Sequence, residues 1–321
     1  MRVTLGFDTS CYTTSAAAVN EQGEVVAASR MLLPVPQGER GLRQSEAVFA
    51  HVRQMPLVMD RLRQQLEGQA AEVVAVCASS APRDEEDSYM PVFMVGLGHA
   101  RVLADVLGVP LFQTSHQQGH VAAGLIGQKH PDEPFVALHL SGGTTELLAC
   151  ENERLTLLGG CADLHAGQMI DRVGVAMGLP FPAGPSLEKL AMGFEGTVES
   201  LLPVSMEKDG LTCHLSGVET RAQQWIREGT LSHEKIAAEV FDVLARTVAR
   251  LLTGACQHVN ARKVLVVGGV ASSTLLRGQL RRRLAKQRRP VEVLFGQPQF
   301  SADNAAGVAS IGMRRFLEQQ K

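Results

Sequence analysis

The sequence carries one pattern twice: three short β-compatible stretches joined by tight polar turns, then amphipathic helical stretches and a further apolar strand. The three stretches fall, in the first and second copies, at residues 3–8, 13–19 and 25–31 and at residues 135–140, 144–150 and 154–158. In each copy a turn of glycine or hydroxyl residues joins the first two strands, DTSCYTT at 8–14 and SGGTTE at 141–146. A repeat of this length predicts two lobes, each built on a mixed sheet.

The later elements of each copy extend this interpretation. Helices are expected at residues 46–66, 93–107, 170–177 and 232–258, and apolar strands at 73–76 and 264–267. The last of these strands ends in Gly268-Gly269 and enters a helix at about Ser273. This is a natural nucleotide seat, because glycine permits close approach and a helix start offers free N–H groups.

Two β-β-β-α-β-α units with phosphate-type hairpin turns describe the actin-like ATPase fold, an α/β architecture of two duplicated lobes around a nucleotide cleft. We expect the first lobe at residues 1–112 with 304–321 and the second at residues 113–303. Two unrelated α/β layers with ordinary turns are the alternative.

A histidine pair lies near the middle of the chain. Residues 115–120 read SHQQGH and follow a short apolar strand at 110–113, so Ser115 is a candidate N-cap and the histidines fall one helical turn apart. Two imidazoles and one carboxylate form a usual ligand set for a divalent transition metal, and Asp303 is the expected third ligand. The zinc peptidase pattern H-E-x-x-H is excluded, because Gln117 stands where that pattern needs its general base.

Composition restricts the class of protein. The 321 residues have a formal net charge of −2, and no apolar stretch approaches the roughly 20 residues of a membrane span. Six cysteines without a C-x-x-C pair, and a start without a signal layout, indicate a cytoplasmic protein with reduced thiols and no membrane attachment. A basic run at 277–289 predicts either a solvated helix end or a contact with a phosphate backbone.

These motifs occur together, and in the same order, in one family. The chain resembles the TsaD/Gcp family of tRNA N6-threonylcarbamoyladenosine synthases, once called O-sialoglycoprotein endopeptidases. The resemblance spans nearly the full length and rests on the segments at 8–14, 115–120, 141–145, 268–273 and 302–305.

The resemblance implies transfer of a threonylcarbamoyl group from threonylcarbamoyl-AMP to the N6 of an adenosine next to the tRNA anticodon. It implies one divalent metal per chain, iron or zinc, and a nucleotide ligand that is threonylcarbamoyl-AMP or ATP. Expected partners are tRNA, a smaller actin-like homologue and an ATPase. The metal ligands would be His116, His120 and Asp303. The substrate and nucleotide site would comprise His139, Leu140, Ser141, Gly142, Gly143, Asp171, Gly184, Gly268, Gly269 and Ser273.

The sequence departs from the family pattern around these residues. Tyr12 and Thr13 replace an acidic pair, Gln118 a glutamate, Thr144 a histidine and Ser273 an asparagine. The stretches at 39–51 and 78–91 are also rewritten. A divergent paralogue is therefore the alternative, with a different small-molecule transfer or kinase activity, or with a non-catalytic scaffolding role. No general base is identified, and His139 and Asp171 are candidates by residue type alone.

Overall fold

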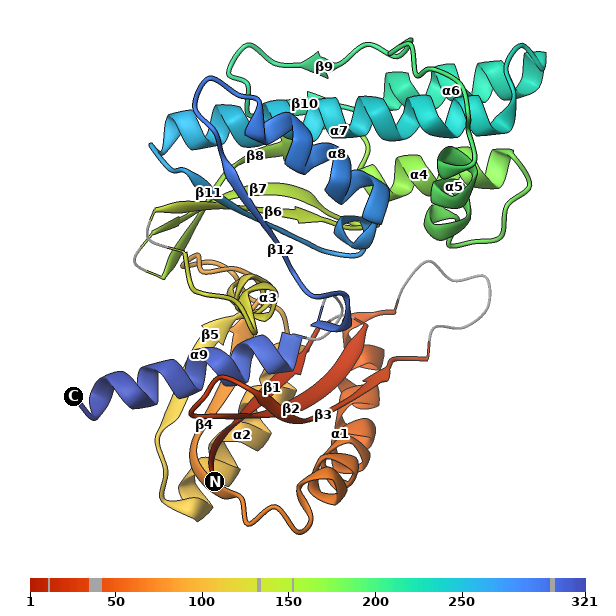
Figure 1. Cartoon of the computed structure of the whole chain (residues 1–321). Helices are drawn as coiled ribbons and strands as arrows, with labels where there is room; N and C mark the ends of the chain where they lie inside the picture. Colours follow the sequence, from red (N-terminus) through yellow and green to blue (C-terminus); the bar gives the residue numbers. More distant parts are fainter. Residues whose placement is uncertain (11, 35–41, 132–133, 152, 301–303) are drawn as a thin grey trace. The chain divides into compact units, whose positions relative to one another are not determined.

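The computed structural model describes residues 1–10, 12–34, 42–131, 134–151, 153–300 and 304–321. The chain divides into unit 1, Met1–Lys129 with Gln299–Lys321, and unit 2, His130–Pro298 (Figure 1). Residues 113–129 fall in unit 1, so this division differs from the expected boundary at residue 112. The reason is that helix α3 (His116–Leu125) packs against helix α9 (Asn304–Gln319), which belongs to unit 1.

Unit 1 contains a five-stranded sheet in the order β3-β2-β1-β4-β5. Its strands are β1 (Arg2–Thr9), β2 (Thr13–Asn20), β3 (Val25–Leu32), β4 (Glu72–Ala81) and β5 (Leu111–Ser115). Strands β1 to β3 form an antiparallel meander, β4 runs parallel to β1, and β5 runs parallel to β4. The three strands expected in the first copy are therefore confirmed.

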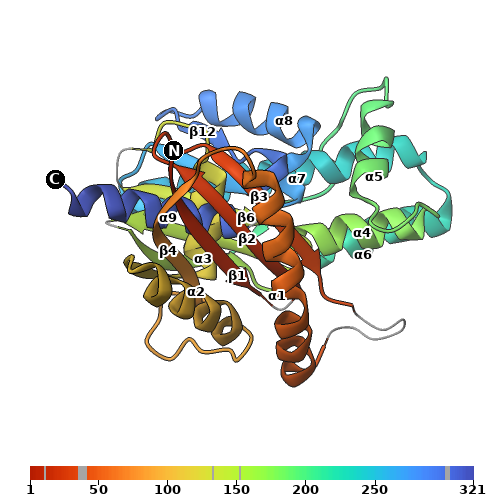
Figure 2. The same cartoon turned by 90° about the horizontal axis from the view of Figure 1, so that it is seen from below.

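Helices cover both faces of this sheet. Helices α1 (Gln44–Leu66) and α2 (Phe93–Leu107) lie on one face and α9 on the other (Figure 2). Alternate residues of β1, such as Val3 and Phe7, pack toward α1 and α2, whereas Ala17 and Val19 of β2 pack toward α9. Because both faces are covered, β1 and β2 are buried along almost their whole length.

Unit 2 repeats the arrangement around its own first strand. The order of its sheet is β12-β11-β6-β7-β8-β10-β9. The strands are β6 (Phe135–Leu140), β7 (Thr145–Glu151), β8 (Arg154–Cys161), β9 (Ser205–Met206), β10 (Thr212–His214), β11 (Lys263–Val267) and β12 (Glu292–Phe295). Strands β6 to β8 form an antiparallel meander, and β11 and β12 continue parallel to β6. The expected duplication is confirmed, and β10 and β9 extend the second sheet beyond β8.

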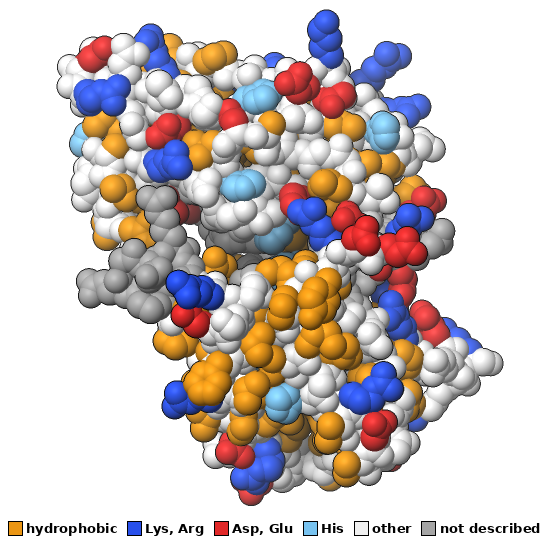
Figure 3. Space-filling model, turned by 180° about the vertical axis from the view of Figure 1, so that it is seen from behind, with side chains coloured by type: hydrophobic (Ala, Val, Ile, Leu, Met, Phe, Trp, Pro, Cys, Tyr) orange, Lys and Arg blue, Asp and Glu red, His pale blue; other side chains and the backbone are white. Residues whose placement is uncertain are grey.

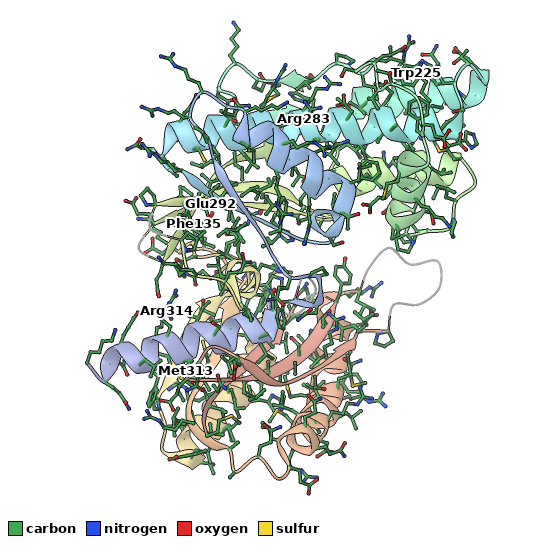
Figure 4. All side chains as sticks on the ribbon, viewed as in Figure 1. Phe135, Trp225, Arg283, Glu292, Met313 and Arg314 are labelled. Carbon is green, nitrogen blue, oxygen red and sulfur yellow. The ribbon has the colours of Figure 1, made fainter. Side chains whose placement is uncertain are left out.

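The helices of unit 2 surround one large hydrophobic core. They are α4 (Ala166–Ala176), α5 (Gly184–Met192), α6 (Ser216–Glu228), α7 (His233–His258) and α8 (Thr274–Ala285), with short 3-10 turns η1 (Val270–Ser272) and η2 (Pro298–Phe300) after β11 and β12. Helix α7 is buried along most of its length, and its Asp242 carboxylate pairs with Arg246 and with Arg283. Arg283 lies on α8, which packs against α7 (Figure 4).

No helix in the described part of the chain is long and apolar enough to span a membrane.

Candidate functional site

The start of α3 brings the two histidines together. Ser115 Oγ accepts from the Gln118 amide N at 3.1 Å, and Gln118 Oε1 accepts from the Ser115 amide N at 3.0 Å. This reciprocal cap confirms the predicted N-cap and fixes where the helix begins. His116 and His120 then stand one turn apart, with ring centroids 4.6 Å from each other and planes at 70°.

The carboxylate of Asp8 orients His116. Asp8, the last residue but one of β1, is 1% exposed and has both carboxylate oxygens 3.0 Å from His116 Nδ1. Ser79 Oγ of β4 donates to the same carboxylate. An ionised carboxylate only accepts, so Nδ1 is the donor in this pair, and in the neutral form of the ring Nε2 is the nitrogen that keeps a lone pair. A carboxylate that holds a histidine in this tautomer is the usual support of a metal-binding imidazole.

Asn304, the first residue of α9, lies against the same ring. Its Nδ2 donates to the His116 backbone oxygen at 3.0 Å and lies 2.5 Å from Nδ1. Because Nδ1 carries the proton that Asp8 accepts, the bond to the backbone oxygen is the one that this tautomer allows. Asn304 is 3% exposed, and its Oδ1 has no hydrogen-bond partner among the described residues. A buried oxygen without a partner beside two imidazoles suits a cation or a polar ligand.

These donors fit a divalent transition metal. Two neutral imidazoles and a nearby amide oxygen match the ligand types of such an ion, and Asp8 supplies the support for His116. The third predicted ligand, Asp303, lies outside the described residues. Within the residues that the structure describes, no three His, Cys, Asp or Glu side chains are grouped so as to hold a metal.

The rewritten stretch after β4 lies directly beside the histidines. The Gln117 amide N donates to Pro82 O at 3.0 Å, and Gln118 Nε2 donates to Asp84 Oδ2 at 3.2 Å. The Arg83 amide N donates to Ser88 Oγ at 2.9 Å, which closes the loop on itself. The departure from the family pattern is therefore located at the first turn of α3. The other rewritten stretch, around Gly41, lies partly outside the described residues.

Buried polar side chains bond to described residues of the turn between β1 and β2, which we call the first hairpin turn (residues 8–10 and 12–14). His51 of α1 is buried, with Nε2 2.8 Å from Ser10 O and Nδ1 2.8 Å from Thr14 Oγ1. Burial lowers the pKa of His51, while the bond to Ser10 and the charge of Asp8 oppose that shift. Thr9 Oγ1 donates to Val92 O at 2.8 Å and so ties the turn to the start of α2.

The turn between β6 and β7, which we call the second hairpin turn (Ser141–Thr144), is open. The Ser141 amide N donates to Thr144 O at 2.8 Å, and a Cβ placed on Gly142 or Gly143 would meet nothing within 4 Å. Helix α4 begins directly on this turn, with the Gly167 amide N 3.1 Å from Ser141 O. A methyl on Gly167 would lie 2.6 Å from the Gly142 Cα, so only glycine permits this contact. The turn therefore offers a ligand both space and backbone N–H groups.

The carboxylates of Asp171 and Glu188 connect the helices around that turn. Asp171 Oδ1 accepts from the Ala183 amide N at 2.8 Å, next to Gly184 at the start of α5. Glu188 Oε1 accepts from the Leu275 amide N at 2.8 Å at the start of α8. Ser273 Oγ caps the same helix by accepting from the Leu276 amide N at 3.1 Å. The expectation of free N–H groups at this helix start is therefore wrong for Leu275 and Leu276.

The Gly268-Gly269 turn lies against the end of β6. Gly268 has a φ of 100°, and a Cβ there would lie 2.5 Å from Leu140 O and 2.9 Å from His139 Cδ2. Since β11 pairs in parallel with β6, both turns follow the carboxyl ends of adjacent parallel strands. That edge of an α/β sheet is where ligands bind in this class of fold. Unit 2 thus brings together His139, Leu140, the second hairpin turn and Gly268.

A family model described as TsaD, tRNA N6-adenosine threonylcarbamoyltransferase, matches residues 35–310. The chain belongs to the TsaD family. It is a member in which Gln118 and Ser273, both departures from the family pattern, serve here as helix caps.

Solved structures similar to this TsaD family member show its fold. An activator of 2-hydroxyisocaproyl-CoA dehydratase from Clostridium difficile, with bound ADPNP, is 16% identical with a TM-score of 0.55, and the match covers 99% of this chain and 97% of that one. A ROK family glucokinase from Streptomyces griseus, in complex with glucose and AMPPNP, is 14% identical with a TM-score of 0.54 and coverages of 97% and 99%. Full-length HypF in a phosphate- and nucleotide-bound form is 11% identical with a TM-score of 0.60, and the match covers 100% of this chain but 46% of that one. The chain has the actin-like ATPase fold predicted from the duplication.

The sequence analysis did not place several of the residues that lie around the histidine pair of unit 1 or around the second hairpin turn of unit 2. Glu188 and Gly167 act through contacts between elements far apart in the chain, and local patterns carry no signal for such contacts, whereas Asn304 belongs to the segment at 301–304 that was expected beside the histidines. Asp8 did carry a signal, because a carboxylate at the end of a buried apolar strand is costly unless it has a partner.

Proposed function

We propose that this chain transfers a threonylcarbamoyl group from threonylcarbamoyl-AMP to the N6 of an adenosine next to the tRNA anticodon. The observation that carries the proposal is the TsaD family match over residues 35–310. The paired histidines and the open second hairpin turn support it, because they supply the donor types and the turn that the reaction needs. The proposed substrate is found in the cytoplasm, where we expect the protein to act.

The proposed metal is one divalent ion, iron or zinc, held by His116, His120 and Asp303. When bound, such an ion neutralises negative charge on the carboxyl or phosphate oxygens of the adenylate. The contacts of His116 support this assignment, because Asp8 holds the ring with Nε2 as the available donor. Asn304 fixes the backbone of the same residue.

The nucleotide is assigned to the residues of unit 2. The second hairpin turn would hold the phosphate, since its two glycines leave open space beside backbone N–H groups. Glu188 already places a negative charge at the start of α8, which excludes a second anion there. The Gly268-Gly269 turn is therefore assigned to the adenine, and Asp171, with Oδ1 on the Ala183 amide, to the ribose hydroxyls through its other oxygen.

The C-terminal end of α8 is the proposed contact for the tRNA backbone. The stretch from Val270 to Val291 contains seven Lys or Arg residues and no Asp or Glu. Two of the seven are committed to the fold, Arg277 to backbone oxygens and Arg283 to Asp242. The others are exposed and form no ion pair with any described residue: Arg281, Arg282, Lys286, Arg288 and Arg289. Unpaired cations on one helix end match the spaced charges of a phosphate backbone.

Unit 1 offers the face for the proposed protein partner, a smaller actin-like homologue, with an ATPase as the further partner. Hydrophobic side chains gather on unit 1 in the view from behind, on the side where α1 and α2 lie (Figure 3). The exposed apolar residues of these helices are Phe49, Val52, Leu57, Met94, Val102, Val106 and Leu107. Monomeric proteins rarely leave so many apolar side chains together in water, so the face favours a protein partner.

The test combines purified protein, threonylcarbamoyl-AMP, unmodified tRNA and the family partners, with the modified nucleoside measured by mass spectrometry after digestion. We expect modified adenosine, and less of it when Arg282 and Lys286 are both changed to Gln. Each lost phosphate contact should reduce the salt dependence of tRNA binding by about one unit of slope. Arg277→Gln is unsuitable as a control because the Arg277 side chain bonds to backbone oxygens of the fold, so Arg154→Gln, at an exposed arginine of β8, serves instead. Absence of modified adenosine under all these conditions would sink the proposal.

A second candidate is transfer to, or phosphorylation of, a different small molecule. It is favoured by one observation: the rewritten stretch at Pro82 and Asp84 contacts the first turn of α3, beside His116. A change at that place alters what the site accepts while leaving the histidine pair intact. Elemental analysis separates the two candidates, since about one iron or zinc per chain favours the first and magnesium the second.

A further inference from the structure

Two cysteines that are far apart in the sequence lie side by side in the second sheet. Cys213 of β10 is the direct partner of Cys161 of β8 in a parallel pairing. Paired residues of neighbouring strands have their Cα atoms about 4.8 Å apart and their side chains on the same face. That spacing lies within the range of a disulfide bond.

The two thiols are not equivalent. Cys161 is partly exposed, whereas Cys213 is 1% exposed. The hydrogen bond with Cys213 lowers the pKa of Cys161 to about 7, against the opposing effect of burial. The same hydrogen bond, with burial, raises the pKa of Cys213. Near neutral pH, Cys161 is thus the accessible nucleophile and Cys213 the protonated neighbour.

The other cysteines in the described residues differ from Cys161 in exposure. Cys77, Cys150 and Cys256 are all buried. Burial raises the pKa of Cys256 to about 12, so this thiol is a matched unreactive control in the same unit.

We propose that Cys161 and Cys213 form a reversible, peroxide-sensitive pair. The Cys161 thiolate attacks hydrogen peroxide, so that an S–O bond forms, the O–O bond breaks, and the hydroxide that leaves takes up a proton to become water. The Cys213 thiol then attacks the sulfur of the resulting sulfenic acid. The S–S bond forms, the S–O bond breaks, and the departing oxygen leaves as water with the thiol proton. Two equivalents of a small thiol restore the pair by thiol–disulfide exchange.

The pair is connected to the second hairpin turn through α4. The Ala162 amide N donates to Cys213 O at 3.0 Å, and the Cys161 thiol donates to Leu164 O at 3.0 Å. Two residues later α4 begins, and the amide N of Ala166 donates to Thr145 Oγ1 at 3.0 Å beside the turn. Forming an S–S bond of about 2.05 Å turns the Cys161 sulfur toward Cys213 and removes its bond to Leu164 O. Oxidation therefore shifts the start of α4 and weakens phosphate binding, a consequence that rests on the proposed nucleotide site.

The test begins with the reduced full-length chain, treated with hydrogen peroxide, alkylated and analysed by intact mass and by non-reducing peptide mapping. We expect a Cys161–Cys213 cross-linked peptide that dithiothreitol removes. We also expect Cys161 to be alkylated on the order of tenfold faster than Cys256 at pH 7. Sulfinic acid at Cys161 without the cross-link, or cross-links through other cysteines alone, would overturn the proposal.

Variants separate the two chemical steps. Cys213→Ser should leave a sulfenic acid on Cys161 that dimedone traps, whereas Cys256→Ser should behave like the unmodified chain. Peptide mapping of the wild-type chain tests the Cys161–Cys213 bond without any variant. A missing cross-link in that experiment therefore contradicts the proposal even if a variant misfolds. For the consequence, affinity for a fluorescent adenine nucleotide is compared before and after oxidation, with a several-fold loss expected. An unchanged affinity overturns the link to the turn alone, while a reduced chain that binds no nucleotide counts against the proposed function and not against the pair.

Discussion

The two hairpin turns stand at equivalent positions of the duplicated units and yet differ in content. In the described part of the first hairpin turn, protein side chains bond to one another and to the backbone: Asp8 contacts Ser79 and His116, Thr9 donates to Val92 O, and the His51 ring lies between Ser10 and Thr14. In the second, Gly142 and Gly143 face open space. The comparison indicates that the two units share one backbone arrangement, while the side chains at their turns differ. One turn supports the histidine pair, and the other is left free for a ligand.

The strongest test of the first turn's task is His116→Ala. We expect loss of bound metal and a fall in transfer activity on the order of 100-fold or more, because one of two imidazole donors is removed. Elemental analysis and the transfer assay measure the two effects. His99→Ala is the control, since His99 also lies on a helix but is exposed, with its Nδ1 2.8 Å from Val95 O. Unchanged metal content in His116→Ala would contradict the assignment.

The variant Asp8→Asn tests the residue that orients His116 and leaves the proposed metal ligands unchanged. The amide keeps the shape of the side chain but loses the charge that holds the proton on Nδ1. We expect metal affinity to fall about 10- to 100-fold with the fold retained. Competition with a chelator measures the affinity, and Asp84→Asn provides a nearby carboxylate that should have no such effect. Equal losses of metal affinity in both variants would show that any nearby negative charge supports metal binding, and not the contact of Asp8 with His116 Nδ1.

Two glycine variants test the second turn. Gly167→Ala places a methyl 2.6 Å from the Gly142 Cα and should destabilise the chain by about 1–3 kcal/mol. Gly142→Ala meets open space, so its free energy of unfolding should stay within about 0.5 kcal/mol of wild type while nucleotide affinity falls. Urea unfolding and nucleotide titration distinguish the two. If Gly142→Ala bound nucleotide as well as wild type, the turn would not be the phosphate site.

The smallest effect is a pH dependence at the first turn. Burial lowers the pKa of His51 below 6.5, so the unfolded chain binds this proton more readily than the folded one. The contribution of the neutral His51 ring to the free energy of unfolding is therefore present above pH 6.5. It is lost as the pH falls toward the lower pKa that His51 has in the folded chain. Unfolding midpoints at pH 7.5 and 5.5 should differ more for wild type than for His51→Gln. Equal differences would exclude His51 as the source.

Much of the fold could be predicted from residue patterns, because strands and long helices depend mainly on residues that are close together in the sequence. The helix at 93–107, the strand at 264–267 and both meanders were found at or near their expected bounds. Helices α5 and α6 were not predicted, since each contributes only two or three buried residues and so leaves a weak apolar period. The short strands β9 and β10, which bring Cys213 to Cys161, have almost no local signal.

The candidate site was predictable in its residue types and less so in its contacts. The spacing of His116 and His120 places them on one face wherever α3 forms, so their proximity could be inferred. The bond from Glu188 to the start of α8 depends on how α5 packs, and without it the helix start was expected to be free. Whether Asp303 joins the histidines is still a prediction.

Helix α9 has a consequence for how the molecule is made. It follows all of unit 2 in the chain, yet it covers one face of the sheet in unit 1, against residues such as Ala17 and Val19. A ribosome releases the chain from its N-terminus, so this apolar face stays uncovered while the whole of unit 2 is synthesised. Unit 2 can complete its core first, and the unit that is begun earliest is finished last. During that interval the nascent chain presents an aggregation-prone surface that chaperones would be expected to shield.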